Sequence, residues 1–400
     1  MLVKSIFLSY VAFWFASGSL FGCQKSKYHE FEKVDAVIEA AIADGAFPSA
    51  VVGVLRENKI LFHKAYGKLT YEKNSPKTTL STIYDLASLT KALATTLSLM
   101  KLYEEGQFRL TDKVSRYLPE LKGNHKEEIT IRNLLLHNAG FVPFRPFIRT
   151  CFSPDDVMRA IYQDSLCYPT GTKTIYSDID FILLGELVHR LSGKPLDEYF
   201  HENFAKPLGL ESTFFLPPDS LRYRIAPTEI DTTWHLPRAR PLVHDPNAAL
   251  LGGVAGHAGL FSTSGDILRL MSMVMNGGKF NGKEILKPEI VWLFTKRDTV
   301  LRQRALGWDM KSPGAHSSAG KYFSLATFGH LGFTGTSVWV DPARSLCVVF
   351  LTNRVYPSAS NKRIRAIRPK LHDAVIESIE PNAQPDTSFA APDTSHAASQ

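Results

Sequence analysis

The chain has 400 residues, 44% of them hydrophobic and 21% charged, and its 46 Lys and Arg against 39 Asp and Glu give a net charge of +7. This composition excludes a disordered chain, and four cysteines are too few for a disulfide scaffold. The positive charge is spread along the chain, so we expect no nucleic-acid partner. The length alone favours two or three domains.

The first 22 residues are predicted to be an export signal. Lys4 gives a positive start, residues 6–16 are apolar, and small residues follow. The apolar run is shorter than the roughly 20 residues that span a bilayer, which disfavours a membrane helix. The segment ending at Cys23 is similar to a bacterial lipobox, which implies acylation of Cys23, with residues 23–30 as anchor and linker. We therefore expect an exported, periplasmic protein anchored to a membrane by lipid; a cleaved, unanchored product is the alternative.

Hydrophobic periodicity predicts the secondary structure in chain order. An opening helix over residues 31–44 places Phe31, Val34, Ile38 and Ala41 on one face. The predicted elements that follow are strands at 50–56 and 59–65, helices at 89–105, 131–137, 154–163, 181–191 and 266–275, strands at 337–340 and 346–352, and a last helix after Asn361. Strands at both ends with helices between them favour an α/β or α+β fold with a helical insert.

The remaining cysteines and the C-terminal tail carry structural expectations. Cys151 and Cys167 bracket a predicted helix, and either a bridge between them or two free, buried thiols fits an exported protein. Cys347 lies in an apolar strand pattern and is expected to be inert core. Residues 381–400 are rich in Ala, Ser, Pro, Asp and Thr, which predicts a disordered tail.

Ser88 and Lys91 form the first candidate for chemistry. A spacing of three places the hydroxyl and the amine on the same side of a helix's first turn. A serine hydroxyl becomes a good nucleophile only when a neighbouring base takes its proton. Alone, the pair is more often an N-capping serine with a solvated lysine. Tyr176 precedes another helical pattern, and a phenol there could share a proton with Lys91, whose charge would lower its pKa.

A third segment, His330-Leu331-Gly332, opens a strand-like run that ends at Val340. Gly332 is expected to leave room for a substrate backbone at the strand edge. Each segment has an ordinary structural explanation of its own, with Tyr176 as a packed core tyrosine and His330 as a strand-end histidine. Their joint occurrence in this order is the informative observation.

Together these segments resemble the penicillin-recognising serine hydrolases, which carry S-x-x-K, S-D-N and K-T-G elements. A tyrosine heading the second element is similar to the class C branch, which includes peptidases and esterases. Two further stretches agree with that branch, Leu-Leu-Leu-His-Asn-Ala-Gly at 134–140 and the glycine-rich segment 252–262. With Val243-His244-Asp245, the resemblance is closest to the penicillin-binding protein 4B type, and it covers about residues 31–375.

The resemblance implies one catalytic domain over residues 31–378. It would have an antiparallel sheet built from the N- and C-terminal segments, flanked by helices, with an inserted and mostly helical lobe. Ser88 would be the acylated nucleophile, Lys91 its partner in proton transfer, and Tyr176 the general base and acid. The backbone N–H groups of Ser88 and Phe333 would bind the oxyanion.

The resemblance also implies which residues contact the substrate, namely Asp178, His330, Gly332 and Phe333. Asp178 stands where the family usually has asparagine, and as an acceptor only it favours a substrate N–H. His330 stands where many members have lysine, and because histidine is mostly neutral near pH 7 it binds a carboxylate less firmly. This departure disfavours a dedicated β-lactamase.

The implied partners are peptidoglycan peptides and β-lactams, with D-alanyl-D-alanine peptides as substrates of a DD-carboxypeptidase-like enzyme. An esterase or D-aminopeptidase, a class C-like β-lactamase and a non-turnover muropeptide- or penicillin-binding module are the alternatives. No cofactor is expected, because the glycine-rich segment lacks the pattern of a phosphate loop and is more simply a close-packed turn. His244 and His257 might suggest a metal, but the sequence has no His-Glu-x-x-His motif and no spaced cysteine pair, so no metal is expected either.

Overall fold

The computed structural model describes residues 31–230, 243–299, 304–313 and 317–386. The predicted signal, the linker and Cys23 therefore lie outside the described residues, as does the predicted tail from 387 onward. Residues 381–386 are described and lie against the fold, where the Asp386 carboxylate accepts a hydrogen bond from the Leu325 backbone N–H at 2.9 Å.

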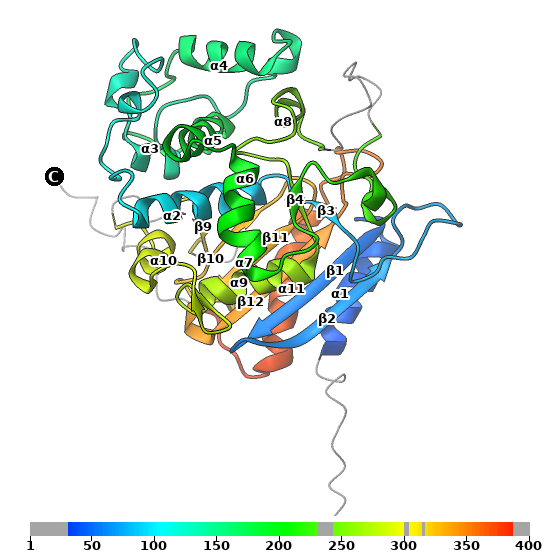
Figure 1. The fold of residues 1–400 in the computed structure, drawn as a ribbon. Helices are drawn as coiled ribbons and strands as arrows, with labels where there is room; N and C mark the ends of the chain where they lie inside the picture. Colours follow the sequence, from blue (N-terminus) through cyan, green and yellow to red (C-terminus); the bar gives the residue numbers. More distant parts are fainter. Residues whose placement is uncertain (1–30, 231–242, 300–303, 314–316, 387–400) are drawn as a thin grey trace, which may run out of the picture.

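A seven-stranded antiparallel sheet forms the centre of the molecule, with the order β2-β1-β12-β11-β10-β9-β8 (Figure 1). Its strands are β1 (Ser49–Arg56), β2 (Lys59–Gly67), β8 (Arg304–Ala305), β9 (Trp308–Met310), β10 (Phe328–Leu331), β11 (Ser337–Asp341) and β12 (Leu346–Thr352). β1 pairs with β12 in a register that sets Ala50 opposite Thr352 and Arg56 opposite Leu346. The predicted closure of one sheet by segments from opposite ends of the chain is confirmed.

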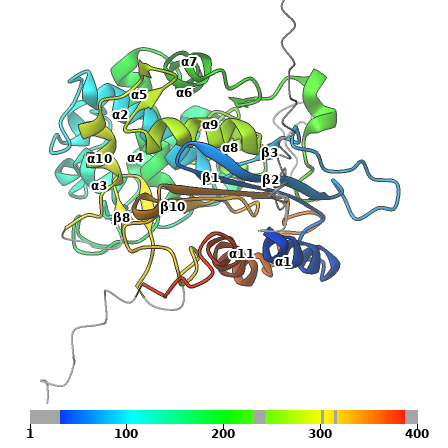
Figure 2. The same ribbon diagram turned by 90° about the horizontal axis from the view of Figure 1, so that it is seen from below.

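Both faces of this sheet are covered because β1 and β12 are apolar on both sides. Val52 and Val54 face the layer formed by α1 (Glu32–Ala43) and α11 (Ile364–Ile379), which lie side by side under the sheet (Figure 2). Val51 faces the opposite layer, where α9 (Ser264–Met275) packs. Strands buried on two faces read as continuous hydrophobic runs rather than as an alternation.

The second layer continues into a mostly helical lobe (Figure 1). Its α-helices are α2 (Leu97–Glu104), α3 (Ile131–Leu135), α4 (Pro154–Gln163), α5 (Asp178–Ser192), α6 (Leu196–Phe200), α7 (Lys206–Leu208), α8 (Pro246–Leu250) and α10 (Pro288–Thr295). Two π-helical segments precede α2 and α7, at Lys91–Thr96 and His201–Ala205, and short 3-10 turns occur at Val114–Arg116, Lys126–Glu128, Phe147–Arg149, Asp219–Arg224 and Pro342–Arg344. α5 is buried around most of its surface, so it is the central helix of this lobe.

Two small sheets complete the fold. One has the order β3-β5-β4, from β3 (Tyr84–Asp85), β5 (Leu260–Ser262) and β4 (Phe214–Phe215), and the other pairs β6 (Lys279–Phe280) with β7 (Lys283–Glu284). β3 leads directly into the Ser88 segment, and β5 forms the end of the glycine-rich segment. The first small sheet therefore joins two of the segments that the sequence motifs singled out.

Two predictions need correction. The run from His330 to Val340 is not one strand, because β10 ends at Leu331 and a tight turn follows, in which the Gly332 N–H donates to the Thr336 carbonyl at 2.7 Å. Cys151 and Cys167 are both free, and Cys167 is exposed rather than buried. Cys347 is fully buried as predicted, and burial raises the pKa of its thiol.

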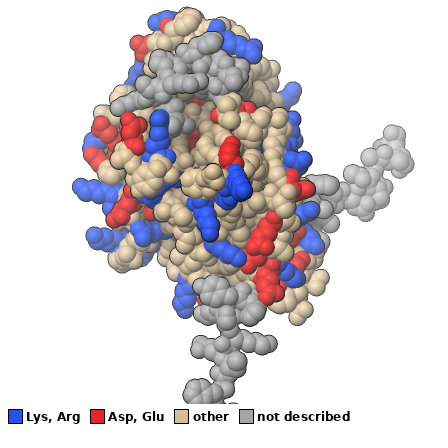
Figure 3. All heavy atoms as spheres, turned by 90° about the vertical axis from the view of Figure 1, so that its right-hand side faces the viewer, with Lys and Arg blue, Asp and Glu red and all other residues tan. Residues whose placement is uncertain are grey.

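Charged side chains of both signs are interspersed on the face shown in Figure 3, without a single basic patch. Within the described ranges, no helix has both the length and the apolar character needed to cross a membrane.

Candidate active site

Ser88 stands on a sharp turn between β3 and the helix that contains Lys91. The buried Asp85 carboxylate fixes this turn by accepting hydrogen bonds from the backbone N–H groups of Ala87 and His244, each at 2.7 Å. Ala87 has a φ of +47°, which is uncommon for a residue other than glycine. Ser88 itself remains partly exposed, so a substrate has access to its hydroxyl.

Lys91 is fully buried and points back at Ser88. Its Nζ lies 3.1 Å from Ser88 Oγ, 2.7 Å from Asp178 Oδ1 and 3.0 Å from the His257 carbonyl oxygen. Burial lowers the pKa of Lys91, but the Asp178 carboxylate and Tyr176 outweigh it, so the net shift is upward. The alternative of an N-capping serine with a solvated lysine is therefore wrong.

Tyr176 completes the group from the loop that precedes α5. Its ring centroid lies 4.9 Å from Lys91 Nζ, and its hydroxyl interacts with both Lys91 and Ser88. Burial raises the pKa of the phenol, and the nearby Lys91 cation offsets part of that rise. A hydroxyl, an amine and a phenol thus meet at one point, which is an arrangement that can pass a proton to and from Ser88.

Asp178 is the first residue of α5, and its carboxylate is committed to Lys91. Ser177 caps the helix by accepting a hydrogen bond from the Ile179 N–H at 3.2 Å, and its hydroxyl donates to the Val142 carbonyl at 2.7 Å. These contacts hold the loop so that Asp178 and Tyr176 both face Lys91. The family resemblance predicted only a substrate contact for Asp178. The structure shows that the Asp178 carboxylate also forms an ion pair with Lys91.

His330 lies on β10 and forms another side of the site, next to Tyr176. Its ring centroid lies 5.9 Å from that of Tyr176, and its Nδ1 donates to the Leu331 carbonyl at 2.8 Å. Its Nε2 is buried and has no hydrogen-bond partner among the described residues. Burial lowers the pKa of His330 to about 4, although Asp309 opposes that shift, so the imidazole is neutral near pH 7.

The turn after His330 lies against the turn that carries Ser88. Thr334 Oγ1 donates to the Asp85 carbonyl at 2.7 Å, and Thr336 Oγ1 donates to the Leu86 carbonyl at 3.1 Å. A Cβ on Gly332 would lie 2.0 Å from Thr336 Oγ1 and 2.5 Å from the Leu86 oxygen. The glycine is therefore required by this packing, and the space expected there for a substrate backbone is occupied by the protein itself.

Phe333 follows Gly332 and presents its ring to solvent, with 54% of its surface exposed. The ring stacks on His244 at a centroid distance of 5.6 Å, and the Arg354 guanidinium carbon lies 4.3 Å from its centroid. In the described part of the chain, the backbone N–H groups of Ser88 and Phe333 donate to no other residue. Both donors therefore remain available to a substrate oxygen.

Sequence reasoning missed several residues beside Tyr176. The buried His137 has its ring centroid 4.6 Å from that of Tyr176, and its Nδ1 accepts the Ser177 N–H at 3.1 Å. The Arg304 guanidinium lies 5.4 Å from the Tyr176 ring centroid and donates to Asp309 at 2.5 Å. His137 falls in the stretch 134–140 that matched the family, which was an available signal. No local pattern marks Arg304.

The glycine-rich segment contributes to the site through its backbone. A Cβ on Gly256 would lie 2.0 Å from the Phe181 carbonyl oxygen and 2.8 Å from Gly185 Cα, so the segment packs directly on α5. This packing confirms the close-packed turn, and the carbonyl of the next residue, His257, is the one that accepts from Lys91. The His257 side chain lies 2.9 Å from Asp245.

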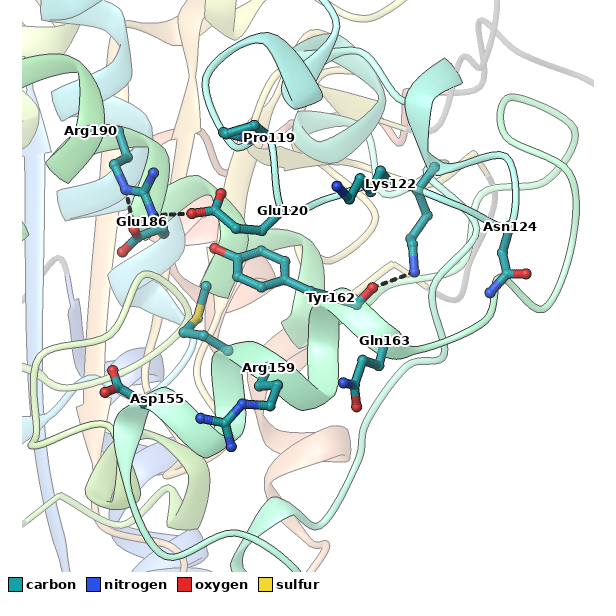
Figure 4. A pocket seen from close by; sticks show the side chains of 12 residues that line it. Pro119, Glu120, Lys122, Asn124, Asp155, Arg159, Tyr162, Gln163, Glu186 and Arg190 are labelled. Carbon is teal, nitrogen blue, oxygen red and sulfur yellow. Dashed lines mark hydrogen bonds and ion pairs between the residues drawn. The ribbon is translucent and has the colours of Figure 1, made fainter.

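A separate hollow of about 950 Å³ lies on the helical lobe (Figure 4). Three of its charged side chains pair with one another: Arg190 contacts Glu120 at 3.0 Å and Glu186 at 2.7 Å. The Lys126 ammonium donates to the Tyr162 carbonyl at 2.6 Å. None of the residues with catalytic potential lines this hollow.

The sequence of this chain is similar to those of known proteins over most of the described fold. The profile of the beta-lactamase family matches residues 34–371. The chain belongs to the beta-lactamase family. It is accordingly a serine hydrolase. A relative from Escherichia coli K12, named "putative D-alanyl-D-alanine carboxypeptidase", is 34% identical over 78% of this chain and 79% of its own length.

Solved structures support the family fold. EstCE1, a hydrolase with promiscuous acyltransferase activity, has a TM-score of 0.71 at 24% identity, with 87% of this chain and 99% of that chain covered. A penicillin-binding protein homologue from Caulobacter crescentus has a TM-score of 0.68 at 23% identity and covers 87% and 97%. A class C beta-lactamase has a TM-score of 0.68 at 18% identity and covers 88% and 99%. The predicted fold class is confirmed.

Proposed function

We propose that this beta-lactamase-family protein is a DD-carboxypeptidase-like enzyme that acts through an acyl-enzyme on D-alanyl-D-alanine-ended peptides of peptidoglycan. The observation that carries the proposal is the buried Lys91 ammonium, 3.1 Å from Ser88 Oγ and close to the Tyr176 ring. The D-alanyl-D-alanine carboxypeptidase name of a relative 34% identical to this chain supports the choice of substrate.

In the acylation step, Tyr176 acts as the general base in its phenolate form, which the Lys91 cation stabilises. The Ser88 oxygen attacks the carbonyl carbon of the penultimate D-alanine while its proton passes to Tyr176. The N–H groups of Ser88 and Phe333 bind the oxyanion that forms. Tyr176 then returns the proton to the leaving amine, and the terminal D-alanine departs as the C–N bond breaks.

Deacylation reverses these roles with water as the nucleophile. Tyr176 takes a proton from the water, whose oxygen attacks the ester carbon of the acyl-enzyme. The same two N–H groups bind the second oxyanion. The proton then returns to Ser88 Oγ as the ester C–O bond breaks, which restores the free serine and releases the shortened peptide as a carboxylic acid that loses its proton to solvent. A penicillin acylates Ser88 in the same way, but its leaving amine stays covalently attached to the acyl group.

An esterase on the same site is the second candidate. The observation that favours it is His330, which is neutral and buried where many family members place a lysine. An ester without a terminal carboxylate needs no cation at that position. The neutral His330 counts against a class C-like β-lactamase because a β-lactam carries a carboxylate. A D-Ala-D-Ala peptide carries one as well, so it is the carboxypeptidase name of the relative that favours the peptide over the β-lactam.

We also propose that the protein is exported and held at a membrane on the periplasmic side through a lipid on Cys23. The support for this proposal is the lipobox-like Leu20-Phe21-Gly22-Cys23 segment, after an apolar run too short to span a bilayer. Metabolic labelling with a palmitate analogue should mark the wild-type chain, while Cys23→Ser should carry no label. A labelled Cys23→Ser chain, or an unlabelled wild type, would contradict acylation at this residue.

Intact-mass spectrometry after exposure to penicillin and, separately, to a D-Ala-D-Ala peptide tests the enzymatic proposal. We expect a penicillin adduct on Ser88, loss of one alanine from the peptide, and neither event in Ser88→Ala. Turnover of nitrophenyl esters without peptide cleavage would favour the esterase. An adduct with no turnover of peptide or ester would favour a binding module, and rapid hydrolysis of the penicillin adduct would favour a β-lactamase.

A further inference from the structure

A buried arginine lies behind the proposed oxyanion-binding turn. Arg368, in the second turn of α11, is 6% exposed. Its Nη2 donates to the Gly332 carbonyl at 2.8 Å and to the Thr336 carbonyl at 2.7 Å. These two carbonyls stand at the two ends of the turn, so one guanidinium group ties both ends together.

The Gly332 carbonyl belongs to the same amide group as the Phe333 N–H. The peptide unit is planar and conjugated, so a positive charge bound to its oxygen draws electron density from its nitrogen. A charge-assisted hydrogen bond is about twice as strong as a neutral one, and linked hydrogen bonds polarise one another. Arg368 therefore acts on the donor strength of the Phe333 N–H through the carbonyl oxygen of the same amide.

The cation is not neutralised where it lies. In the part of the chain that the structure describes, no carboxylate pairs with Arg368. Burial, with Arg354 and Arg365 nearby, lowers the pKa of Arg368 to about 9, so the guanidinium is still charged near pH 7. A buried arginine that binds only backbone carbonyls is costly to fold, since it lacks a compensating anion.

A second arginine, Arg354, binds the same turn at a different amide. Arg354 donates to the Phe333 carbonyl at 2.7 Å, which belongs to the next amide along the chain. It also donates to the Ala359 and Asn361 carbonyls, at 2.8 and 2.7 Å. Arg354 thus supports the same turn without bonding to the amide that contains the Phe333 N–H.

We propose that Arg368 is a positioning residue of this enzyme, which holds the turn after His330 and polarises the Gly332–Phe333 amide so that the Phe333 N–H binds the oxyanion more strongly. This inference rests on the proposed function, in which Ser88 is acylated. It concerns both chemical steps, because acylation and deacylation each pass through an oxyanion.

The test is the carbonyl stretch of the penicillin acyl-enzyme, measured by infrared difference spectroscopy with a ¹³C-labelled β-lactam carbonyl, together with the acylation rate constant. Full loss of an oxyanion donor costs about 10²–10³ in rate, so we expect weakening by Arg368→Met to slow acylation about tenfold. The stretch should move to higher wavenumber, since a weaker hydrogen bond leaves more double-bond character.

Two matched variants separate polarisation from loss of support. Arg354→Met removes a buried arginine that bonds to the same turn from just after β12, and it should leave the stretch at its wild-type position. Arg365→Met removes an exposed charge one turn earlier on α11 and should change neither quantity. If Arg368→Met acylates at the wild-type rate, or slowly with an unshifted stretch, the polarising role is wrong.

If Arg368→Met does not fold, Arg368→Lys takes its place. The shorter lysine keeps the charge, but its single ammonium should not reach both the Gly332 and the Thr336 carbonyls. The stretch should still move upward, and an unshifted stretch in a folded Arg368→Lys overturns the inference. Failure of the proposed function looks different: the wild-type protein itself would then form no acyl adduct.

Discussion

Lys91 and Asp178 form a buried ion pair, with Nζ 2.7 Å from Oδ1, the lysine side chain fully shielded and the aspartate 18% exposed. The pair joins the helix that follows Ser88 to the first residue of α5. Because Asp178 also raises the pKa of Tyr176, it disfavours the phenolate that the proposed mechanism needs. The carboxylate therefore helps to set the pH at which the site becomes active.

Asp178→Asn should move the rising limb of kcat/KM to lower pH. Loss of the negative charge lowers the pKa of Lys91 and of Tyr176 alike, so deprotonation occurs earlier as pH rises. We expect a shift of about one pH unit, so that the rate at a given pH on the limb rises about tenfold. Because the pKa of Tyr176 is raised above its ordinary value of 10, rates on a nitrophenyl ester between pH 8 and 11, corrected for hydrolysis without enzyme, measure the shift. A limb that stays or moves to higher pH would contradict the assigned roles.

His330→Lys should increase preference for substrates with a free carboxylate. The native imidazole is neutral because burial lowers its pKa to about 4, whereas a lysine brings a cation to the position. We expect the ratio of kcat/KM for a D-Ala-D-Ala peptide over its methyl ester to rise about tenfold. His330→Gln, which stays neutral, is the control. An equal rise in that variant would show that charge at this position is not the determinant.

Gly256→Ala should destabilise the fold and reduce activity together. The added Cβ would lie only 2.0 Å from the Phe181 carbonyl oxygen. To avoid this clash the glycine-rich segment must move, and with it the His257 carbonyl that binds Lys91. We expect a loss of about 3 kcal/mol in the free energy of unfolding, measured by urea denaturation. Gly265→Ala is the control, because the nearest atom to its Cβ would be 3.8 Å away. Similar stability of both variants would show that the segment moves without cost.

His372→Gln should reduce the loss in the free energy of unfolding that occurs as the pH falls from 7 to 5. Burial lowers the pKa of His372 to about 4, from 6.5 for an exposed histidine, so only the unfolded chain gains a proton between those values. The contribution is present above about pH 6.5 and is lost as pH falls, by about 1.4 kcal/mol per unit. Urea unfolding at pH 7 and pH 5 measures it. An unchanged slope in the variant would mean that the buried histidine accepts a proton in the fold.

Local patterns predicted the parts of the fold that depend on neighbours in sequence. The spacing of Val34, Ile38 and Ala41 matches the buried face of α1, Phe31 is buried just before the helix, and the two strands predicted at 50–56 and 59–65 form and pair. Ser88 and Lys91 are three residues apart, so their contact follows from helical geometry once the helix forms.

Other features depend on contacts between distant segments, which no local pattern reveals. Asp85 fixes the Ser88 turn by binding the backbone of His244, and His137 reaches Tyr176 only because α3 packs on α5. The turn after His330 was predicted as continuous strand because Gly332 was interpreted as room for a substrate backbone, although Gly332 and Gly335 are also turn signals. Tyr176 itself was identified through its place in a family motif rather than through its own surroundings.

The pairing of β1 with β12 also governs how the protein forms. The sheet cannot close until residues 346–352 have been synthesised, and contacts of such long sequence separation make folding slow. The segments that carry Ser88 and His330 are brought together by strands from opposite ends, so neither half of the chain contains a complete site. Covalent labelling of Ser88 would therefore serve as a reporter of completed folding, and a nascent chain would remain unreactive until its last strand is in place.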